Sequence, residues 1–205
     1  TALVLGFLVV CTAATHAQTP PSIPIGPGLT EDKPQSKLWY TDNADRTVTW
    51  WGILGFVGDA TAAPGVYFYK LENGVLVRQA FPDALVDANI EARADVLWNG
   101  THLFALMYKG EDTTLSRYSY DASTQTYTLL AGFPVAIPLL AGSETATITQ
   151  DSTGQLWIAY DPAISPALPK VCPPDVDDPE DPDAEIHALW SVDHTTWDVM
   201  NNRVV

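Results

Sequence analysis

The chain has 205 residues, and a hydrophobic fraction of 46% is enough to build a sizeable core, which argues against global disorder. Asp and Glu number 25 against 10 Lys and Arg, so the formal net charge is −15. This balance argues against nucleic acid and anionic membranes as partners, because phosphate binding needs a basic surface. We interpret the charge as keeping a secreted protein soluble, with binding of Ca²⁺ or other cations as the alternative.

The first 17 residues predict a secretory signal peptide. Residues 3–14, LVLGFLVVCTAA, are almost wholly apolar and uncharged, and the small-x-small sequence Thr15-His16-Ala17 follows them. This apolar run is too short to span the roughly 30 Å of bilayer hydrocarbon. We therefore expect a secreted, extracellular or cell-surface protein with no membrane span after signal removal.

Residues 18–35 predict a linker, because five prolines interrupt any regular structure there. From residue 36 onward, short β-type runs alternate with turns rich in Gly, Asn, Asp, Ser and Thr. The one place where a single helical turn fits is residues 83–88.

One of the β-type runs recurs along the chain. The run QLWIAY at residues 155–160 corresponds to THLFALMY at 101–108 and to TVTWWGILGF at 47–56. This alignment places Trp51, Phe104 and Trp157 in one column, with 53 residues from the first to the second and 53 from the second to the third. The runs before and after each of them also correspond. The pattern therefore predicts a unit of four strands that occurs three times.

Four short strands with a period near 50 residues are typical of β-propeller blades. A single four-stranded sheet cannot bury both of its faces, whereas blades stacked side by side can, with Trp51, Phe104 and Trp157 between them. We predict an all-β protein, a partial β-propeller of about three four-stranded antiparallel blades. Their ranges are 36–82, 92–134 and 144–200 within a propeller region of 36–205. An ordinary antiparallel sandwich is the alternative.

Two motifs resemble secreted bacterial β-propeller proteins with Kelch-like or sialidase-like (Asp-box) blades. Residues 151–157, DSTGQLW, are similar to a D-x-x-G-x-L-W strand turn. Residues 191–197, SVDHTTW, resemble a shortened Asp-box that lacks one residue and the glycine. The resemblance implies an architecture and no particular activity, because the Asp-box is a structural turn. Propellers have four to eight blades, so we expect that the chain is a fragment or that copies associate to complete a ring; the oligomeric state stays open.

An acidic insertion interrupts the third unit at residues 161–185, where seven carboxylates fall within residues 175–185. Repelling charges and prolines predict an extended surface loop. Asp175, Asp177 and Asp181 could supply oxygen ligands to Ca²⁺, although the glycine and terminal glutamate of an EF-hand are missing. Calcium is the one cofactor that the sequence suggests, and a solvated loop is the reading we favour.

Three further residues are candidates for ligand binding. Arg93 and Asp95 open the second unit, where innermost strands line a propeller's channel, although an Arg–Asp pair that ties a blade edge is the reading we favour. Trp50 and Trp51 must point to opposite faces of a strand, so one of them lies away from the column. We take Trp50 as the candidate for stacking on a carbohydrate.

No catalytic set stands out in the sequence, and no catalytic residue is assigned. The function that we expect is a secreted or cell-surface scaffold that binds a glycan or a protein without catalysis. The alternative is a sialidase-like glycoside hydrolase whose catalytic residues are incomplete in this sequence. Such an enzyme needs an arginine cluster, and no arginine here has the F/Y-R-I-P context of that family.

Overall fold

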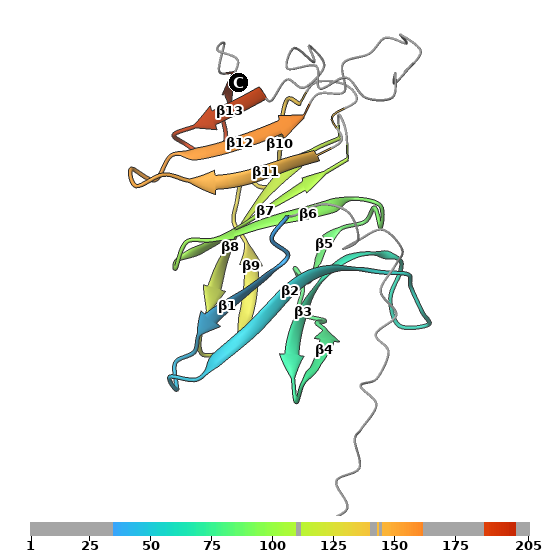
Figure 1. Ribbon diagram of the computed structural model, residues 1–205. Helices are drawn as coiled ribbons and strands as arrows, with labels where there is room; N and C mark the ends of the chain where they lie inside the picture. The colour runs from blue at the N-terminus through green and yellow to red at the C-terminus, as the bar shows by residue number, and fades with distance from the viewer. Residues whose placement is uncertain (1–34, 110–111, 140–142, 144, 162–186, 200–205) are drawn as a thin grey trace, which may run out of the picture.

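The computed structural model describes residues 35–109, 112–139, 143, 145–161 and 187–199. All regular structure in these residues is β, and the strands form three antiparallel sheets, none of them closed (Figure 1). The first sheet contains β1 (Leu38–Asp42), β2 (Val48–Phe56), β3 (Gly65–Glu72) and β4 (Val75–Arg78) in that order, and β5 (Leu85–Asp87) also pairs with β3.

The other two sheets repeat the same chain path. The second runs through β6 (Arg93–Trp98), β7 (His102–Tyr108), β8 (Thr114–Asp121) and β9 (Thr126–Leu129), and β10 (Val135–Ala136) also pairs with β8. The third runs through β11 (Thr145–Gln150), β12 (Leu156–Asp161), β13 (His187–Ser191) and β14 (Asp198–Val199). The prediction of an all-β chain with antiparallel sheets is confirmed. The first two sheets each contain a fifth strand, β5 and β10, and these strands lie outside the expected ranges 36–82 and 92–134.

Tight turns join the strands within each sheet. At the β3–β4 turn, Asn73 has a φ of 51° and Gly74 a φ of 81°. Positive φ at both central residues is what a two-residue type I′ hairpin requires, and Asn-Gly is the dipeptide that tolerates it best. This turn therefore follows directly from the local sequence.

The single helical turn expected at residues 83–88 is wrong. β4 pairs only with residues 69–72 of β3, which leaves the backbone at Val66 and Tyr67 open for β5. The Phe68 N–H also donates to the carbonyl of Ala84 over 2.9 Å. Residues 85–87 therefore pair with the free edge of β3 as strand β5. This edge could not be predicted from the local sequence, because it depends on where β4 ends.

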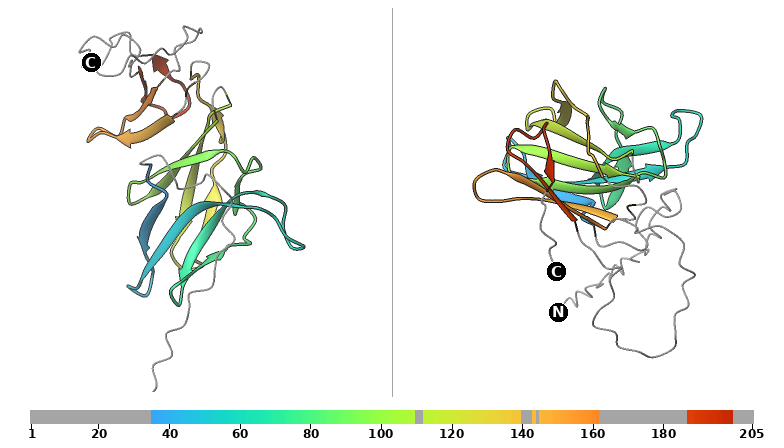
Figure 2. Two further views of the ribbon diagram at one scale, coloured as in Figure 1. Left: turned by 45° about the vertical axis from the view of Figure 1, so that its right-hand side comes forward. Right: turned by 90° about the horizontal axis from the view of Figure 1, so that it is seen from above.

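The second sheet is packed on both faces, with the first sheet on one side and the third on the other (Figure 2). Alternation along β7 sends Leu103, Ala105 and Met107 into a core shared with the first sheet. It sends Phe104, Leu106 and Tyr108 into a second core shared with the third sheet. All six side chains are buried. This explains why β7 reads as a continuous apolar run instead of an alternating one.

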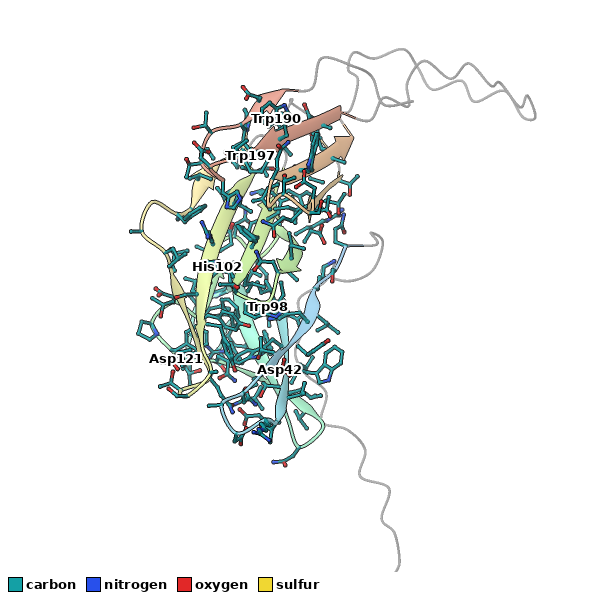
Figure 3. The ribbon with its side chains drawn as sticks, turned by 90° about the vertical axis from the view of Figure 1, so that its left-hand side faces the viewer. Asp42, Trp98, His102, Asp121, Trp190 and Trp197 are labelled. Carbon is teal, nitrogen blue, oxygen red and sulfur yellow. The ribbon has the colours of Figure 1, made fainter. Side chains whose placement is uncertain are left out.

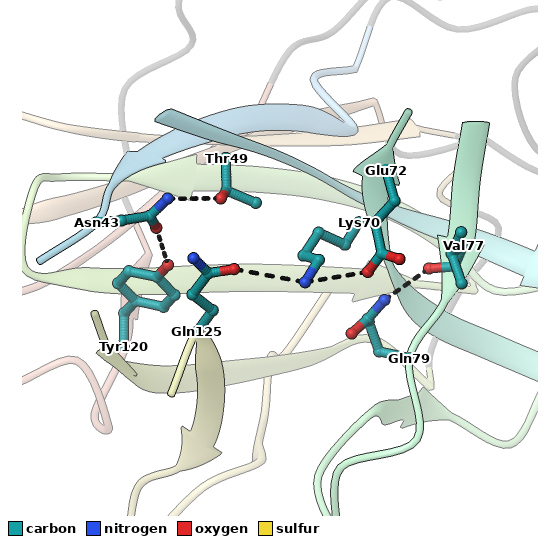
Figure 4. Close-up of polar contacts among 8 residues, drawn as sticks. All are labelled: Asn43, Thr49, Lys70, Glu72, Val77, Gln79, Tyr120 and Gln125. Atoms are coloured by element: carbon teal, nitrogen blue, oxygen red, sulfur yellow. Dashed lines mark hydrogen bonds and ion pairs between the residues drawn. The ribbon is translucent and has the colours of Figure 1, made fainter. Parts of the chain in front are cut away.

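Hydrogen bonds at the outer ends of the strands also connect the first two sheets. The Tyr120 hydroxyl donates to Asn43 Oδ1 over 2.7 Å, and Asn43 Nδ2 donates to Thr49 Oγ1 over 2.8 Å (Figure 4). Nearby, the Lys70 ammonium lies 3.4 Å from Gln125 Oε1 and 3.0 Å from Glu72 Oε1. These contacts form a polar border around the aromatic core between the two sheets.

The column of aromatic residues predicted from the repeat lies in the second strand of each sheet. Trp51 and Phe104 are fully buried, the first in the core between sheets one and two and the second in the core between sheets two and three. Trp157 is only partly buried. It lies on the opposite side of β12 from Leu156 and Ile158, which pack on the second sheet. The third position of the column therefore faces away from the other sheets.

Several sequence predictions lie outside the described residues. They are the signal peptide at 1–17, nearly all of the linker at 18–35, and the acidic loop with Asp175, Asp177 and Asp181. Among the residues that are described, no helix is long and apolar enough to cross a bilayer.

Candidate binding surface

Exposed apolar side chains gather on the face of the first sheet that points away from the second. The described residues include nine exposed large hydrophobic side chains, and six of them lie on this face. Five of the six gather around β1 and the beginning of β2, and Leu85 lies at the other end, beside Tyr67. We call these five the outer aromatic patch: Leu38, Tyr40, Val48, Trp50 and Leu71. Scattered exposed apolar residues are normal on a protein surface, but a cluster on one face marks a candidate interaction site.

Strand alternation creates this patch. In β1 and β2, Trp39 and Trp51 point into the core, so their neighbours Tyr40 and Trp50 must point outward. Trp50 is 47% exposed whereas Trp51 is 0% exposed, which confirms that one residue of this pair lies away from the core column.

The two outward rings lie against each other. Tyr40 and Trp50 are directly paired across β1 and β2, and their ring centroids are 5.6 Å apart with planes at 54°. Gly52 pairs with Leu38 in the same ladder, and a Cβ atom at position 52 would lie 2.8 Å from Leu38 Cδ2. The glycine therefore leaves room for Leu38 beside the aromatic pair.

The other end of the same face is covered by its own side chains. Leu54, Phe56, Tyr67 and Tyr69 form a buried cluster there. The Arg78 guanidinium lies 4.6 Å from the ring centroid of Phe56 and 5.1 Å from that of Tyr67. The exposed apolar side chains of this face are therefore concentrated in the outer aromatic patch, beside β1 and the beginning of β2, and Leu85 alone is exposed at the other end.

Asp95 lies on β6, an edge strand of the second sheet that contacts β1 of the first sheet and β11 of the third. It is 3% exposed, and its carboxylate accepts the Ser36 N–H at 2.7 Å, the Thr147 hydroxyl at 2.6 Å and the Ile148 N–H at 2.8 Å. Ser36 precedes β1, and the other two donors belong to β11. Asp95 therefore ties the first and third sheets to the second.

The three candidate ligand-binding residues do not form one site. Arg93 and Asp95 lie two residues apart on β6, and Arg93 is half-buried. Trp50 lies on the face of the first sheet that points away from β6. The structure therefore places Asp95 in a structural position and leaves Trp50 as the candidate that is open to a ligand.

Short aspartate turns use many of the other carboxylates. Asp45, Asp59, Asp121 and Asp151 each accept both the N–H and the hydroxyl of a Thr or Ser two residues later, over 2.6–3.0 Å. These hydrogen bonds lower the pKa of each carboxyl group because they favour the charged form. Hydrogen bonds from Thr153 and from the Trp157 indole lower the pKa of Asp151 to about 2. The D-x-[ST] spacing was visible in the sequence, but only the turn at Asp151 was recognised from it.

The Asp-box-like segment also forms a structural turn. Asp193 Oδ1 accepts the N–H groups of Thr195 and Thr196 at 2.8 and 2.7 Å, and the His194 N–H donates to Ser191 Oγ at 2.9 Å. Trp197 packs against the second core. These residues therefore serve the fold, as expected for a motif of this kind.

A basic cluster between the second and third sheets was not foreseen. Arg117 Nη2 lies 3.2 Å from His102 Nδ1, and the Arg117 guanidinium lies 5.5 Å from the centroid of the Phe104 ring. The His194 ring packs edge-on against Phe104 at 5.2 Å, and its Nε2 lies 3.0 Å from the carbonyl oxygen of Gly154. Burial, together with the charges of Arg117 and His194, lowers the pKa of His102. The cluster thus surrounds a buried ring and packs the two sheets together.

Within the described ranges, no group of three or more His, Cys, Asp or Glu side chains is placed to hold a metal ion. Comparisons with protein-family models, with curated proteins and with solved structures find no match to this chain. The functional argument therefore rests on the exposed surface of the sheets themselves.

Proposed function

We propose that this chain forms part of a β-propeller, a secreted or cell-surface scaffold that binds a glycan or a protein and catalyses no reaction. The outer aromatic patch is the binding surface. The observation that carries this proposal is the concentration of exposed apolar side chains on one face of the first sheet, whose opposite face is buried in the core.

The arrangement of the sheets supports the propeller part of the proposal. Three similar sheets follow one another in chain order, and the first strand of the second sheet, β6, contacts the first strands of the other two, β1 and β11 (Figure 1). Ser36, just before β1, accepts the Val96 N–H through its carbonyl oxygen over 2.8 Å. Blades arranged around an axis place their first strands together in this way.

Two features of the sequence support the location. The apolar run at residues 3–14 followed by Thr15-His16-Ala17 has the pattern of a signal peptide. The acidic composition suits a protein that must stay soluble outside the cell.

The Tyr40–Trp50 pair is suited to stack on a sugar ring, because exposed aromatic rings combine apolar area with few internal degrees of freedom. The aliphatic side chains of Leu38, Val48 and Leu71 suit a protein ligand instead. Both kinds of ligand would use the same patch, so one set of variants tests both.

A glycan array probed with the chain and with Trp50→Ala tests the glycan form. We expect the variant to lose binding, and the matched control Val57→Ala, at a residue that is exposed outside the patch, to keep it. A protein ligand should show the same dependence in a direct binding measurement. Ligands that bind the Trp50→Ala variant as tightly as the original chain would remove the patch from the proposal.

The non-enzymatic part is tested with a panel of fluorogenic glycosides. We expect no turnover. Hydrolysis that disappears in Arg93→Ala would replace the binding scaffold with a glycoside hydrolase.

A further inference from the structure

The two contacts between sheets use the same pair of faces. We call the face that carries Trp51, Phe104 or Trp157 the forward face of its sheet, and the face that carries Trp50, Leu103 or Leu156 the rear face. The forward face of the first sheet packs on the rear face of the second, and the forward face of the second packs on the rear face of the third. Two faces have no described sheet against them: the rear face of the first sheet and the forward face of the third.

Strand register shows what the rear face of the first sheet would contact. Trp51 and Phe104 are equivalent, and their cross-strand partners are Trp39 and Lys70 in the first sheet and Leu97 and Arg117 in the second. Four residues of the outer aromatic patch are therefore equivalent to four residues of the second sheet. Leu38 corresponds to Val96 and Tyr40 to Trp98. Trp50 corresponds to Leu103 and Leu71 to Tyr118.

All four counterparts belong to the core between the first and second sheets. Val96, Leu103 and Tyr118 are buried. Trp98, which is labelled in Figure 3, is partly buried and packs against the same cluster. The patch is therefore equivalent in strand register to the rear face of the second sheet, and that face packs against another sheet in this chain. Leu156, the equivalent of Trp50 in the third sheet, is also fully buried by the second sheet.

The forward face of the third sheet has the matching character. Trp157 pairs with Trp190 across β12 and β13, and Ala159 pairs with Ala188 beside them. None of these four side chains is buried. The Trp157 indole donates to Asp151 Oδ2 over 3.0 Å, which fixes the ring in place. Small side chains beside fixed rings leave space for the large rings of Tyr40 and Trp50, and large-against-small packing is how sheet faces interdigitate.

We infer that the forward face of the third sheet in one copy of the chain docks on the outer aromatic patch of a second copy. This inference rests on the proposed function, since it names the protein partner of the same patch. The aliphatic residues of the patch favour a sheet over a glycan, because Leu38, Val48 and Leu71 offer no hydrogen bond to sugar hydroxyls. The contact joins two different faces, so the assembly is head-to-tail and either closes into a ring or continues.

Sedimentation equilibrium and light scattering of the chain, followed by single variants, test this inference. We expect the average mass to rise with concentration in the original chain. Trp50→Glu blocks the patch and Ala159→Glu blocks the forward face of the third sheet, and each alone should abolish association. Val57→Glu places the same charge at an exposed position outside both faces, and this control should associate normally. Near-UV circular dichroism checks that each variant is folded, and Tyr40→Glu replaces Trp50→Glu if that variant is not.

A mixture of the two blocked variants gives the decisive result. The Trp50→Glu copy keeps an intact third sheet and the Ala159→Glu copy keeps an intact patch, so an equimolar mixture should form a complex of two copies. A patch that pairs with itself would instead leave Ala159→Glu associated and would overturn the head-to-tail arrangement.

A strictly monomeric original chain would overturn the inference altogether. The proposed function would survive that outcome if a glycan or another protein bound the chain and Trp50→Ala lost the binding. If association and every Trp50-dependent interaction were both absent, the proposed function would fail as well.

Discussion

Asp95 is the only charged side chain that is buried among the described residues, and its three hydrogen bonds join three sheets. A buried carboxylate is tolerated when hydrogen-bond donors surround it. Two of its donors come from the backbone and one from a hydroxyl, so the site holds the strands in a fixed relation.

Removing this carboxylate should destabilise the whole fold. Asp95→Ala leaves two N–H groups and a hydroxyl without their acceptor, and we expect a loss of about 2–4 kcal/mol in the free energy of unfolding. Urea denaturation followed by tryptophan fluorescence measures it.

The matched control for Asp95 is Asp45→Ala, which removes a carboxylate from an exposed turn. We expect a clearly smaller effect there. Asp95→Asn keeps one acceptor oxygen and should fall between the two. Equal losses for Asp95→Ala and Asp45→Ala would contradict the role given to Asp95.

For single residues, the sequence predicted those features that depend on the adjacent residues in the chain. The outward position of Trp50 follows from its adjacency to Trp51, and alternation alone decides it. The partners of Asp95 could not be predicted, because Ser36 lies 59 residues before it and Ile148 lies 53 residues after it. Only the packing of the sheets brings these groups together.

At the scale of the strands, the column at positions 51, 104 and 157 has two buried members and one that is partly exposed. Their equivalence was predictable from the spacing, since each lies in the second strand of its sheet. Their burial was not, because it depends on whether another sheet covers the forward face. The additional strands β5 and β10 were also missed, since two or three residues carry no alternation to recognise.

Alanine substitutions along this column should follow burial. Trp51→Ala and Phe104→Ala remove fully buried rings between sheets, and each should cost about 3–5 kcal/mol of unfolding free energy. Trp157→Ala removes a ring with one open side, so its cost should be no more than about half of that.

Denaturant titrations of these three variants should be made at protein concentrations low enough to keep copies apart. Under those conditions a cost for Trp157→Ala equal to that of Phe104→Ala would contradict the open position of the third forward face. A larger cost that appears only at high concentration would agree with docking between copies.

For the whole molecule, the decisive feature is that only the second sheet has another described sheet on each face. The first sheet has an open rear face and the third an open forward face, although all three share similar strands and turns. The local sequence predicted those strands and turns well, because hairpins depend on short-range patterns. The difference in burial between the three sheets depends on which sheets pack against each other, and this packing is set by the folded chain as a whole.

Amide hydrogen exchange should record this asymmetry directly. Strand β7 lies between two cores, so its amides should exchange at least about tenfold more slowly than those of β2 and β12, the matched second strands of the neighbouring sheets. Mass spectrometry of dilute protein compares the three strands within one sample, so all of them exchange at the same pH and temperature. Equal protection of β7 and β12 in dilute protein would mean that the forward face of the third sheet is already covered within one copy. Protection of β12 that increases with concentration, and not in Ala159→Glu, would instead locate the contact between copies on that face.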